Sequence, residues 1–243
     1  MTRIRIITCY NKRLYDDYAW TTVAKSQSMW HGVDIQRWSE DGAPHSTHDL
    51  NKEPGYVDFL AHWRKLLGPH GRPASYLYDA GRFAHKVFAL TSEEAMEDTD
   101  WLVFLGADVD TLQPVDADWL LRGPLARGDI VHLGRRDIRS SETDFLAIRV
   151  GMDRYAWGES FLSALRHIYT SGDLYNYAEW IDGYIVGRLA AVMEGEGANV
   201  VNLSVGLPGL DVFERTVLGE RLRHWKGPQG KATFKERLRD AKS

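Results

Sequence analysis

At 243 residues, with 44% hydrophobic and 26% charged residues, the chain has the composition of a globular protein with a sizeable core, which excludes a disordered chain. The formal net charge of -4 excludes the global excess of positive charge that is typical of nucleic-acid-binding proteins, although charge can be local. The single cysteine, Cys9, excludes an internal disulfide and a thiolate zinc cluster and favours a reducing, cytoplasmic setting. The apolar stretch near the start is too short for a signal peptide, and no segment approaches a membrane span, so we expect no targeting segment and no membrane anchor.

The first hundred residues alternate short apolar runs with helical patterns. Residues 3–9 first alternate between arginine and isoleucine and then continue with β-branched residues, a pattern typical of a strand. Residues 40–56 are rich in Gly, Pro, Ser and Asp, which indicates a long loop. The patterns predict a strand over 3–9, a helix over 15–29, a strand over 32–39, a loop over 40–56, and helices over 57–67 and 81–98.

The remaining patterns continue this alternation of strands and helices. They predict strands over 101–105, 129–133, 143–150 and 199–205, and helices over 152–169 and 178–195. Strands that alternate with helices of this length are typical of an α/β domain with a mostly parallel sheet. We therefore expect one α/β domain over residues 1–243, with a mostly parallel, mixed central sheet flanked by helices.

The stretch WLVFLGADVDTLQPV, residues 101–115, ends an apolar strand in two aspartates. Residues two apart in an extended chain point to one side, and ligand sites of α/β sheets lie beyond the carboxyl ends of strands. Close carboxylates repel each other unless they share a cation or a proton, and Mg²⁺ or Mn²⁺ bridges such carboxylates to phosphates. Asp108 and Asp110 are therefore candidate metal ligands; alternatively, Asp110 opens a turn and Asp108 caps local backbone.

Basic residues offer candidate phosphate contacts in two places. Residues 215–243 carry nine Lys or Arg against three Asp or Glu, so this tail is either a solvated helix or an anion site. Within it, a glycine-rich spacing separates Lys226 from Lys231, as in a phosphate loop. Arg82 and Lys86 are four apart on a predicted helix and share one face, either to reach phosphates or to be solvated.

An acidic pair lies in EWIDGYIVGRL, residues 179–189. Glu179 and Asp182 are three apart and share a face if the segment is helical. Such a carboxylate can take a proton from a hydroxyl group, with Asp182 as the first candidate and Glu179 as the second. The alternative is a pair of acids that stabilise a helix N-terminus. Trp157, Trp180 and Trp225 lie near these polar segments, where they could stack on a sugar or a base or simply belong to the core.

The chain resembles the GT-A fold glycosyltransferases that use nucleotide sugars, most of all the glycogenin and galactinol-synthase type of family eight. Four short matches occur in the family's order and span most of the chain. They are IITCYNKRLYDDYA for the first strand and nucleotide loop, RFAHKVFAL for the donor-site helix, WLVFLGADVDTLQPV for the metal strand, and HWKGPQGK for the His-x-x-Gly-x-x-Lys element.

The resemblance implies a hexosyltransferase with Mn²⁺ or Mg²⁺, a donor half over about 1–115, and an acceptor half with the basic tail over about 116–243. It implies that His224 completes the metal site with Asp108, whereas Asp110, a candidate ligand from its spacing, has no certain family counterpart. It also implies that Asp182 or Glu179 serves the acceptor. It also implies a set of donor-binding residues: Thr8, Tyr10, Asn11, Arg82, Lys86, Ala107, Asp144, Lys226, Gly227 and Lys231.

One position departs from the family pattern. The family strand usually reads Leu-Asp-Ala-Asp, whereas this chain has Gly106 where the first aspartate stands, and Asp108 matches the second. Either Asp110 takes over as a ligand after a small backbone shift, or Asp108 and His224 hold the metal with more water. The third alternative is a weak or absent metal.

These observations predict a cytoplasmic enzyme that moves a hexose from a nucleotide sugar, a UDP-sugar first, to a hydroxyl group of a carbohydrate, a protein or a modified DNA base. The first alternative is a nucleotidyltransferase of related fold, because the same acids and basic residues suit an α-phosphate. The second is a degenerate site with a basic tail that binds nucleic acid. Glycosyl transfer and nucleic-acid binding would be combined in a phage-like glycosyltransferase of the host cytoplasm that modifies hydroxymethylated DNA bases. Neither the oligomeric state nor retention or inversion at the sugar follows from the sequence.

Overall fold

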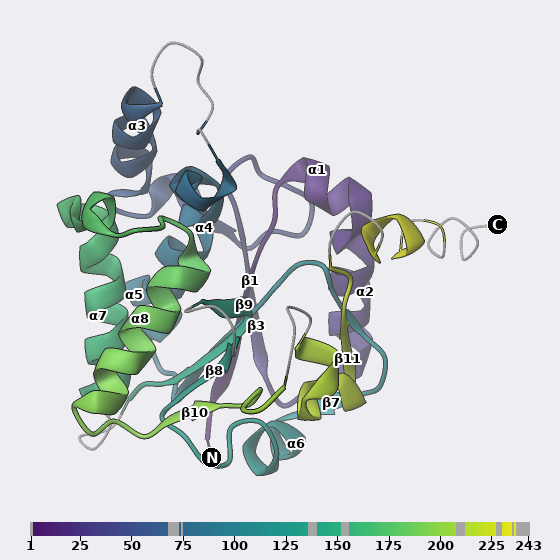
Figure 1. Cartoon of the computed structure of the whole chain (residues 1–243). Helices are drawn as coiled ribbons and strands as arrows, with labels where there is room; N and C mark the ends of the chain where they lie inside the picture. Colours follow the sequence, from purple (N-terminus) through teal and green to yellow (C-terminus); the bar gives the residue numbers. More distant parts are fainter. Residues whose placement is uncertain are drawn as a thin grey trace.

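A computed structural model describes residues 2–67, 73, 75–135, 140–151, 156–207, 212–226, 230–234 and 236. Its centre is a seven-stranded sheet in the order β10-β8-β9-β5-β1-β3-β4, with helices on both faces (Figure 1). All its neighbouring strands are parallel except β9, which runs antiparallel to both β5 and β8. This mostly parallel, mixed sheet flanked by helices confirms the predicted fold class.

The strands of the central sheet follow the apolar runs of the sequence. They are β1 (Ile4–Cys9), β3 (Asp34–Ser39), β4 (His48–Asp49), β5 (Trp101–Leu105), β8 (Ile130–Gly134), β9 (Ser141–Arg149) and β10 (Val200–Asn202). Two small pairs complete the strands. In one, β2 (Trp30–His31) pairs with β7 (Val115–Asp116); in the other, β6 (Val109–Thr111) pairs with β11 (Leu222–His224).

The helices are α1 (Lys12–Leu14), α2 (Trp20–Met29), α3 (Tyr56–Leu66), α4 (Ala80–Leu90), α5 (Glu93–Met96), α6 (Ala117–Arg122), α7 (Ala156–Ser171) and α8 (Asp182–Gly195). A π-helical segment, η1 (Tyr15–Ala19), joins α1 to α2. Short 3-10 helices are η2 (Leu50–Lys52), η4 (Tyr76–Tyr78), η5 (Asp173–Asn176), η6 (Phe213–Arg215) and η7 (Val217–Glu220).

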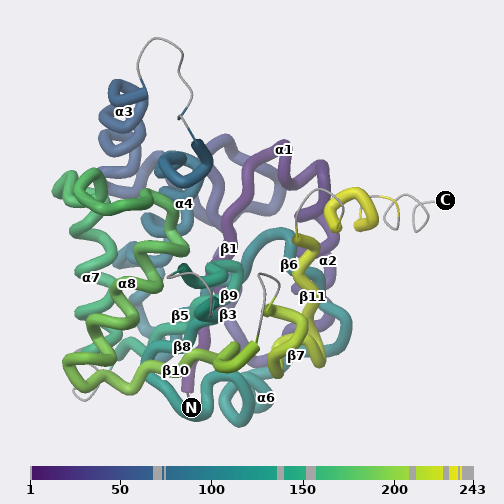
Figure 2. The backbone as a smooth tube through the Cα atoms, viewed as in Figure 1, coloured from purple at the N-terminus to yellow at the C-terminus, as the bar shows by residue number. Residues whose placement is uncertain are grey.

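The two faces of the sheet contribute to separate cores because side chains alternate along each strand. From β1, Ile7 packs with α3, α4, α7 and α8, whereas Ile6 packs with Trp30 and with the segments around α6 and η6. Figure 2 shows α3, α4, α7 and α8 on one side of the sheet and α2 with β11 on the other. In the described part of the chain, no helix combines the length and apolarity that a membrane span requires.

Several predicted bounds differ from the structure for local reasons. The helix predicted over 81–98 ends at Leu90, where the Thr91 hydroxyl donates to the Val87 carbonyl, and a separate short helix follows. The helix predicted over 178–195 begins only at Asp182. The strand predicted over 199–205 ends at Asn202, whose side-chain oxygen accepts a hydrogen bond from the Ser204 amide and starts a turn.

His132 on β8 gives the fold a testable dependence on pH. Its side chain is 9% exposed, and burial lowers its pKa from 6.5 to about 4. Between these pH values the unfolded chain binds a proton that the folded chain does not, so stability falls as the pH falls from 6.5 to about 4. The loss attributable to His132 should reach about 3 kcal/mol.

The variant His132→Asn, which retains a polar partner for the Ser141 hydroxyl, should have a flatter profile over this window. Denaturant unfolding of both proteins at several pH values measures the difference. Parallel profiles for the two proteins would contradict this origin of the pH dependence.

Candidate active site

One edge of the sheet gathers the polar side chains. The parallel strands β1 and β5 both end there, at Cys9 and Leu105. The antiparallel strand β9 begins at the same edge, because Leu105 lies opposite Phe145 in the register. Residues that follow β5 and residues at the start of β9 are therefore neighbours in space. Ligand sites of α/β sheets lie at such an edge.

Asp108, Asp144 and His224 form a compact cluster at this edge. One ligand atom from each residue lies within 4.8 Å of the others. His224 Nε2 is 3.2 Å from Asp144 Oδ2 and 3.6 Å from Asp108 Oδ1. Two carboxylates and one imidazole are a donor set that can hold a divalent cation such as Mn²⁺. The buried Nδ1 atom of His224 has no hydrogen-bond partner among the described residues.

Backbone pairing places two of these side chains together. A turn follows β5, closed by a 3.0 Å hydrogen bond from the Val109 amide to the Gly106 carbonyl, and Asp108 lies in it. The strand β11 pairs antiparallel with β6 and sets His224 opposite Val109. The Trp225 amide donates to the Asp108 carbonyl over 3.2 Å. His224, far along the chain, is thereby fixed beside Asp108.

Asp144 occupies the space beside the glycine that departs from the family pattern. A Cβ atom built on Gly106 would lie 2.4 Å from Asp144 Oδ1 and 2.9 Å from its Cβ, so no larger residue fits without a shift. The Gly106 amide also donates to the Asp144 carbonyl over 3.1 Å. The neighbouring strand thus supplies a carboxylate where the chain lacks one at position 106.

Lys86, on α4, forms ion pairs with the acids Asp144 and Asp182. Its Nζ atom lies 3.3 Å from Asp144 Oδ1, 3.2 Å from Asp182 Oδ2 and 3.2 Å from Thr143 Oγ1. Burial alone would lower the pKa of Lys86, but the charges of Asp144 and Asp182 raise it above its ordinary value. Lys86 is therefore a permanent cation beneath the cluster.

The carboxylates of the cluster stay ionised at neutral pH. Burial alone would raise the pKa of Asp144, but Lys86 and His224 hold it well below its ordinary range. Burial and the charge of Asp144 would raise the pKa of Asp108. His224 and Lys231 have the larger, opposite effect, so the pKa of Asp108 lies below its ordinary value. Lys231 Nζ lies 2.9 Å from Asp108 Oδ2.

His224 responds to the same charges in the opposite direction. Burial would lower its pKa, but Asp144 and Asp108 raise it above the ordinary value. Without a cation the imidazole therefore tends to carry a proton, whereas a metal ligand must be neutral. Binding of a cation at this cluster would release that proton.

Asp182 lies at the first turn of α8 and is 5% exposed. Its Oδ2 accepts a 2.6 Å hydrogen bond from the Thr143 hydroxyl, and its Oδ1 accepts one of 2.8 Å from the Gly183 amide. The helix can approach β9 this closely because Gly183 has no side chain. A Cβ atom at this position would lie 2.5 Å from the Ser141 carbonyl oxygen. Asp182 is thus fixed to both the helix and the strand.

Glu179 does not share a helix face with Asp182, contrary to the helical spacing assumed from the sequence. It lies in the segment before α8, which begins at Asp182. Within the described part of the chain it forms no hydrogen bond or ion pair. The two acids are therefore not a pair.

Asp110 lies away from the cluster. The turn before β6 breaks the alternation that the two-residue spacing assumed, and Asp110 Oδ1 is 2.5 Å from Lys25 Nζ on α2. The same ammonium donates to the Thr111 carbonyl over 3.1 Å. Asp110 thus ties α2 to β6 and does not complete the group of possible metal ligands.

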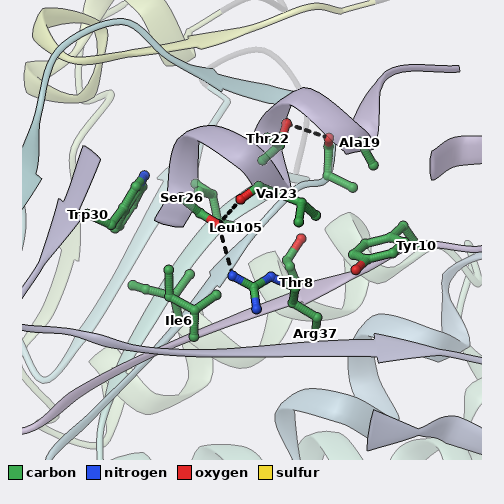
Figure 3. Close-up of a pocket in the computed structure, with 12 residues that line it drawn as sticks. Ile6, Thr8, Tyr10, Ala19, Thr22, Val23, Ser26, Trp30, Arg37 and Leu105 are labelled. Atoms are coloured by element: carbon green, nitrogen blue, oxygen red, sulfur yellow. Dashed lines mark hydrogen bonds between the residues drawn. The ribbon is translucent and has the colours of Figure 1, made fainter. Parts of the chain in front are cut away.

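The residues expected around the nucleotide lie near the end of β1. Thr8 and Tyr10 line a small cavity of about 20 Å³ between α2 and the sheet, together with Ser26 and Arg37 (Figure 3). The Arg37 guanidinium donates to the Ser26 hydroxyl over 3.0 Å, and the Thr8 hydroxyl has no partner among the described residues. Tyr10 is buried and donates to the Pro44 carbonyl. Asn11 caps α1 by accepting from the Leu14 amide.

The other predicted donor residues are distributed around the cluster. Ala107 is buried, and its carbonyl accepts from the Thr22 hydroxyl. Arg82 lies over the Tyr76 ring, 5.3 Å from its centroid, rather than beside Lys86 among the acids. Lys226 forms an ion pair with Glu142. Gly227 lies outside the described residues.

Two polar residues of the site were not predicted. Thr143 bridges Lys86 and Asp182, and buried Glu142 binds both Arg135 and Lys226. Both lie in SETDFLAI at the start of β9, directly before Asp144. The available signal was the density of polar residues at the start of an otherwise apolar strand.

Comparisons with known proteins give structural similarities only. No family model matches the chain, and no curated protein matches it. It is similar to the solved structure of a glycosyltransferase involved in the glycosylation of the major capsid of PBCV-1, with a TM-score of 0.46 and 13% identity over 97% of this chain and 99% of that one. It is also similar to the glycosyltransferase GlyE of Streptococcus pneumoniae TIGR4, with a TM-score of 0.45 and 14% identity over 84% of this chain and 45% of GlyE. These matches assign no donor, acceptor or metal to the chain.

The contact between Gly106 and Asp144 can be tested by a double-mutant cycle. Gly106→Ala should lower the free energy of unfolding by about 1–3 kcal/mol, because the new methyl group collides with Asp144. In a chain that also carries Asp144→Gly, the same change should cost clearly less. Denaturant unfolding of the four proteins measures the coupling, and purely additive losses would contradict the contact.

Proposed function

We propose that the chain is a metal-dependent glycosyltransferase that moves a hexose from a UDP-sugar to a hydroxyl group. The observation that supports this proposal most is the cluster of Asp108, Asp144 and His224, with Lys86 and Lys231 beside it, at the carboxyl edge of the sheet. Carboxylates suit a divalent cation, and lysines suit phosphates. A nucleoside diphosphate with a bound cation needs both.

The three residues of the cluster would hold Mn²⁺, which their mixed oxygen and nitrogen donors fit better than they fit Ca²⁺. When bound, the cation supplies positive charge to the diphosphate leaving group. Lys231 would exchange its contact with Asp108 for a phosphate oxygen. Lys226, from the same segment, is the second lysine for this role. Thr8, Tyr10 and Asn11 would lie on the nucleoside side.

Asp182 is the carboxylate proposed for the acceptor side of the reaction. It can take the proton of the acceptor hydroxyl or stabilise positive charge on the sugar. Lys86 and Thr143 hold the carboxylate in one orientation. Glu179, which lies outside the helix and lacks such contacts, is a weaker candidate for this role.

The pairing of acids with lysines also bears on the alternatives. A nucleotidyltransferase would use the same groups on an α-phosphate, and it would release pyrophosphate from a nucleoside triphosphate. Two of the basic residues in the tail, Lys226 and Lys231, bind acids of the site and do not form a free basic surface. This pairing favours a nucleotide-sugar site over a nucleic-acid-binding tail.

A thermal-shift screen of UDP, GDP, CMP and their sugars, with and without Mn²⁺, tests the donor. UDP or a UDP-sugar with Mn²⁺ should stabilise the protein by about 3 kcal/mol at a hundredfold excess over Kd. Asp108→Asn should abolish the part of the shift that needs Mn²⁺. Asp110→Asn is the matched control, because Asp110 pairs with Lys25, and it should keep the Mn²⁺-dependent shift. No shift with any nucleotide would refute the proposal.

The role of Asp182 can be tested by the hydrolysis or transfer of a UDP-sugar. Asp182→Asn should lower kcat about 100-fold or more, as expected for loss of acid–base or charge stabilisation. Glu179→Gln, the matched control, should change kcat by less than about threefold. If Asp182→Asn weakened UDP binding as much as kcat, Asp182 would only hold Lys86 in place.

A further inference from the structure

Aromatic side chains gather on the surface beside Asp182. Tyr76 and Tyr78 of η4 are 53% and 38% exposed. The Trp180 ring packs edge-on against Tyr78, with centroids 5.2 Å apart, and edge-on against Tyr175, at 5.0 Å. The Trp180 amide donates to the Leu77 carbonyl over 2.7 Å and joins the two segments. We call Tyr76, Tyr78, Tyr175 and Trp180 the aromatic strip.

The aromatic strip begins at the candidate active site. Tyr76 packs edge-on against Phe83, with ring centroids 5.2 Å apart, and Lys86 Nζ lies 5.8 Å from the centroid of Phe83. Lys86 in turn contacts Asp182 and Asp144. Trp180 precedes Asp182 by two residues in the sequence. A molecule on the strip would therefore lie close to Asp182, the acid proposed for the acceptor side.

The other end of the strip opens into a pocket of about 520 Å³ between α3 and the segment from α7 to η5. Tyr175 lines both the strip and the pocket, and its ring centroid is 5.6 Å from that of His62 on α3. Tyr169, 2% exposed, also lines the pocket. Among the described residues, neither tyrosine hydroxyl has a hydrogen-bond partner, although both are buried. A buried hydroxyl without a partner is costly, so we expect either a water molecule or a polar group of a ligand to bond to it.

The chemistry of strip and pocket fits a neutral, hydroxyl-rich molecule with apolar faces. Sugar rings have apolar C–H faces that pack on aromatic rings and hydroxyl groups that bond to tyrosine, histidine and carboxylate side chains. The pocket includes one acid, Asp58, and one lysine, Lys65, so its charges balance. Arg82, a cation next to the aromatic strip, lies over the Tyr76 ring, 5.3 Å from its centroid. A nucleic acid would instead require a concentration of Lys and Arg.

We propose that the aromatic strip and this pocket bind a carbohydrate chain of at least two sugar units as the acceptor. The inference rests on the proposed function, because it places the acceptor hydroxyl next to Asp182. The ring-to-ring steps from Tyr78 through Trp180 and Tyr175 to His62 are 5.0 to 5.6 Å each, so the surface exceeds one sugar ring.

Binding of neutral hexasaccharides to the full chain, with UDP and Mn²⁺ present, tests the proposal. The probes are maltohexaose, cellohexaose, chitohexaose and mannohexaose, and binding is followed by saturation-transfer NMR and tryptophan fluorescence. A duplex with hydroxymethylated cytosines and an unstructured peptide serve as competing acceptor classes. At least one hexasaccharide should bind with a millimolar or lower Kd. Binding of only the duplex or the peptide, or of no probe, would overturn the inference.

Variants locate the binding surface. Trp180→Ala should weaken hexasaccharide binding about tenfold or more, and Tyr78→Ala, at an exposed position, should weaken it in the same direction. Trp119→Ala is the matched control, because this half-buried tryptophan lies on α6, at the other end of the molecule (Figure 1). Unchanged affinity in both Tyr78→Ala and Trp180→Ala would overturn the assignment.

The thermal shift with UDP, measured on the same proteins, separates the two proposals. If UDP stabilises every variant and no hexasaccharide binds, the acceptor inference fails and the glycosyltransferase proposal survives. If UDP stabilises none of them, wild type included, the proposed function itself fails. A retained UDP shift in Trp180→Ala also shows that this variant is folded, so that its loss of carbohydrate binding reports on the strip.

Discussion

The structure at the sheet edge depends on one buried ammonium group. Lys86 projects from α4 between the carboxylates of Asp144 and Asp182, which belong to β9 and α8. A buried charge is tolerated only when it is paired and hydrogen-bonded. Removing one partner leaves the other charge buried without compensation for its lost hydration, which is strongly destabilising. The three elements are therefore held in one arrangement by charge as well as by the apolar core around Phe104 and Val186.

The same principle extends through the rest of the polar cluster. Each buried acid has a cationic partner from another part of the chain: Asp108 contacts Lys231, and Glu142 contacts Lys226 and Arg135. Stacking of Trp225 on Phe234, with centroids 5.0 Å apart, holds the C-terminal segment that carries these lysines. A divalent cation with a diphosphate brings opposite charges together, so it could enter such a cluster without leaving either sign in excess.

Much of the fold followed from the sequence because β1, β5 and β9 have clear apolar patterns that local periodicity reveals. The site followed only in part. Asp108, His224, Lys86 and Lys231 lie together, but the place of Asp144 depends on cross-strand register and that of Asp110 on a turn and on Lys25 from α2. These are long-range relations, which residue spacing along the chain does not contain. Glu179 lies outside the helix for a local reason, because the helix begins at Asp182, four residues later than its pattern indicated.

The position of Asp144 beside Gly106 makes the carboxylate pair a property of two strands rather than of one peptide. Asp108 and Asp144 meet only because β5 and β9 pair with Leu105 opposite Phe145. A slip of one residue in this pairing would turn Asp144 to the opposite face of the sheet. Accurate strand pairing during folding is thus a condition for the chemistry, and a search for two aspartates in a single short motif would pass over a chain built in this way.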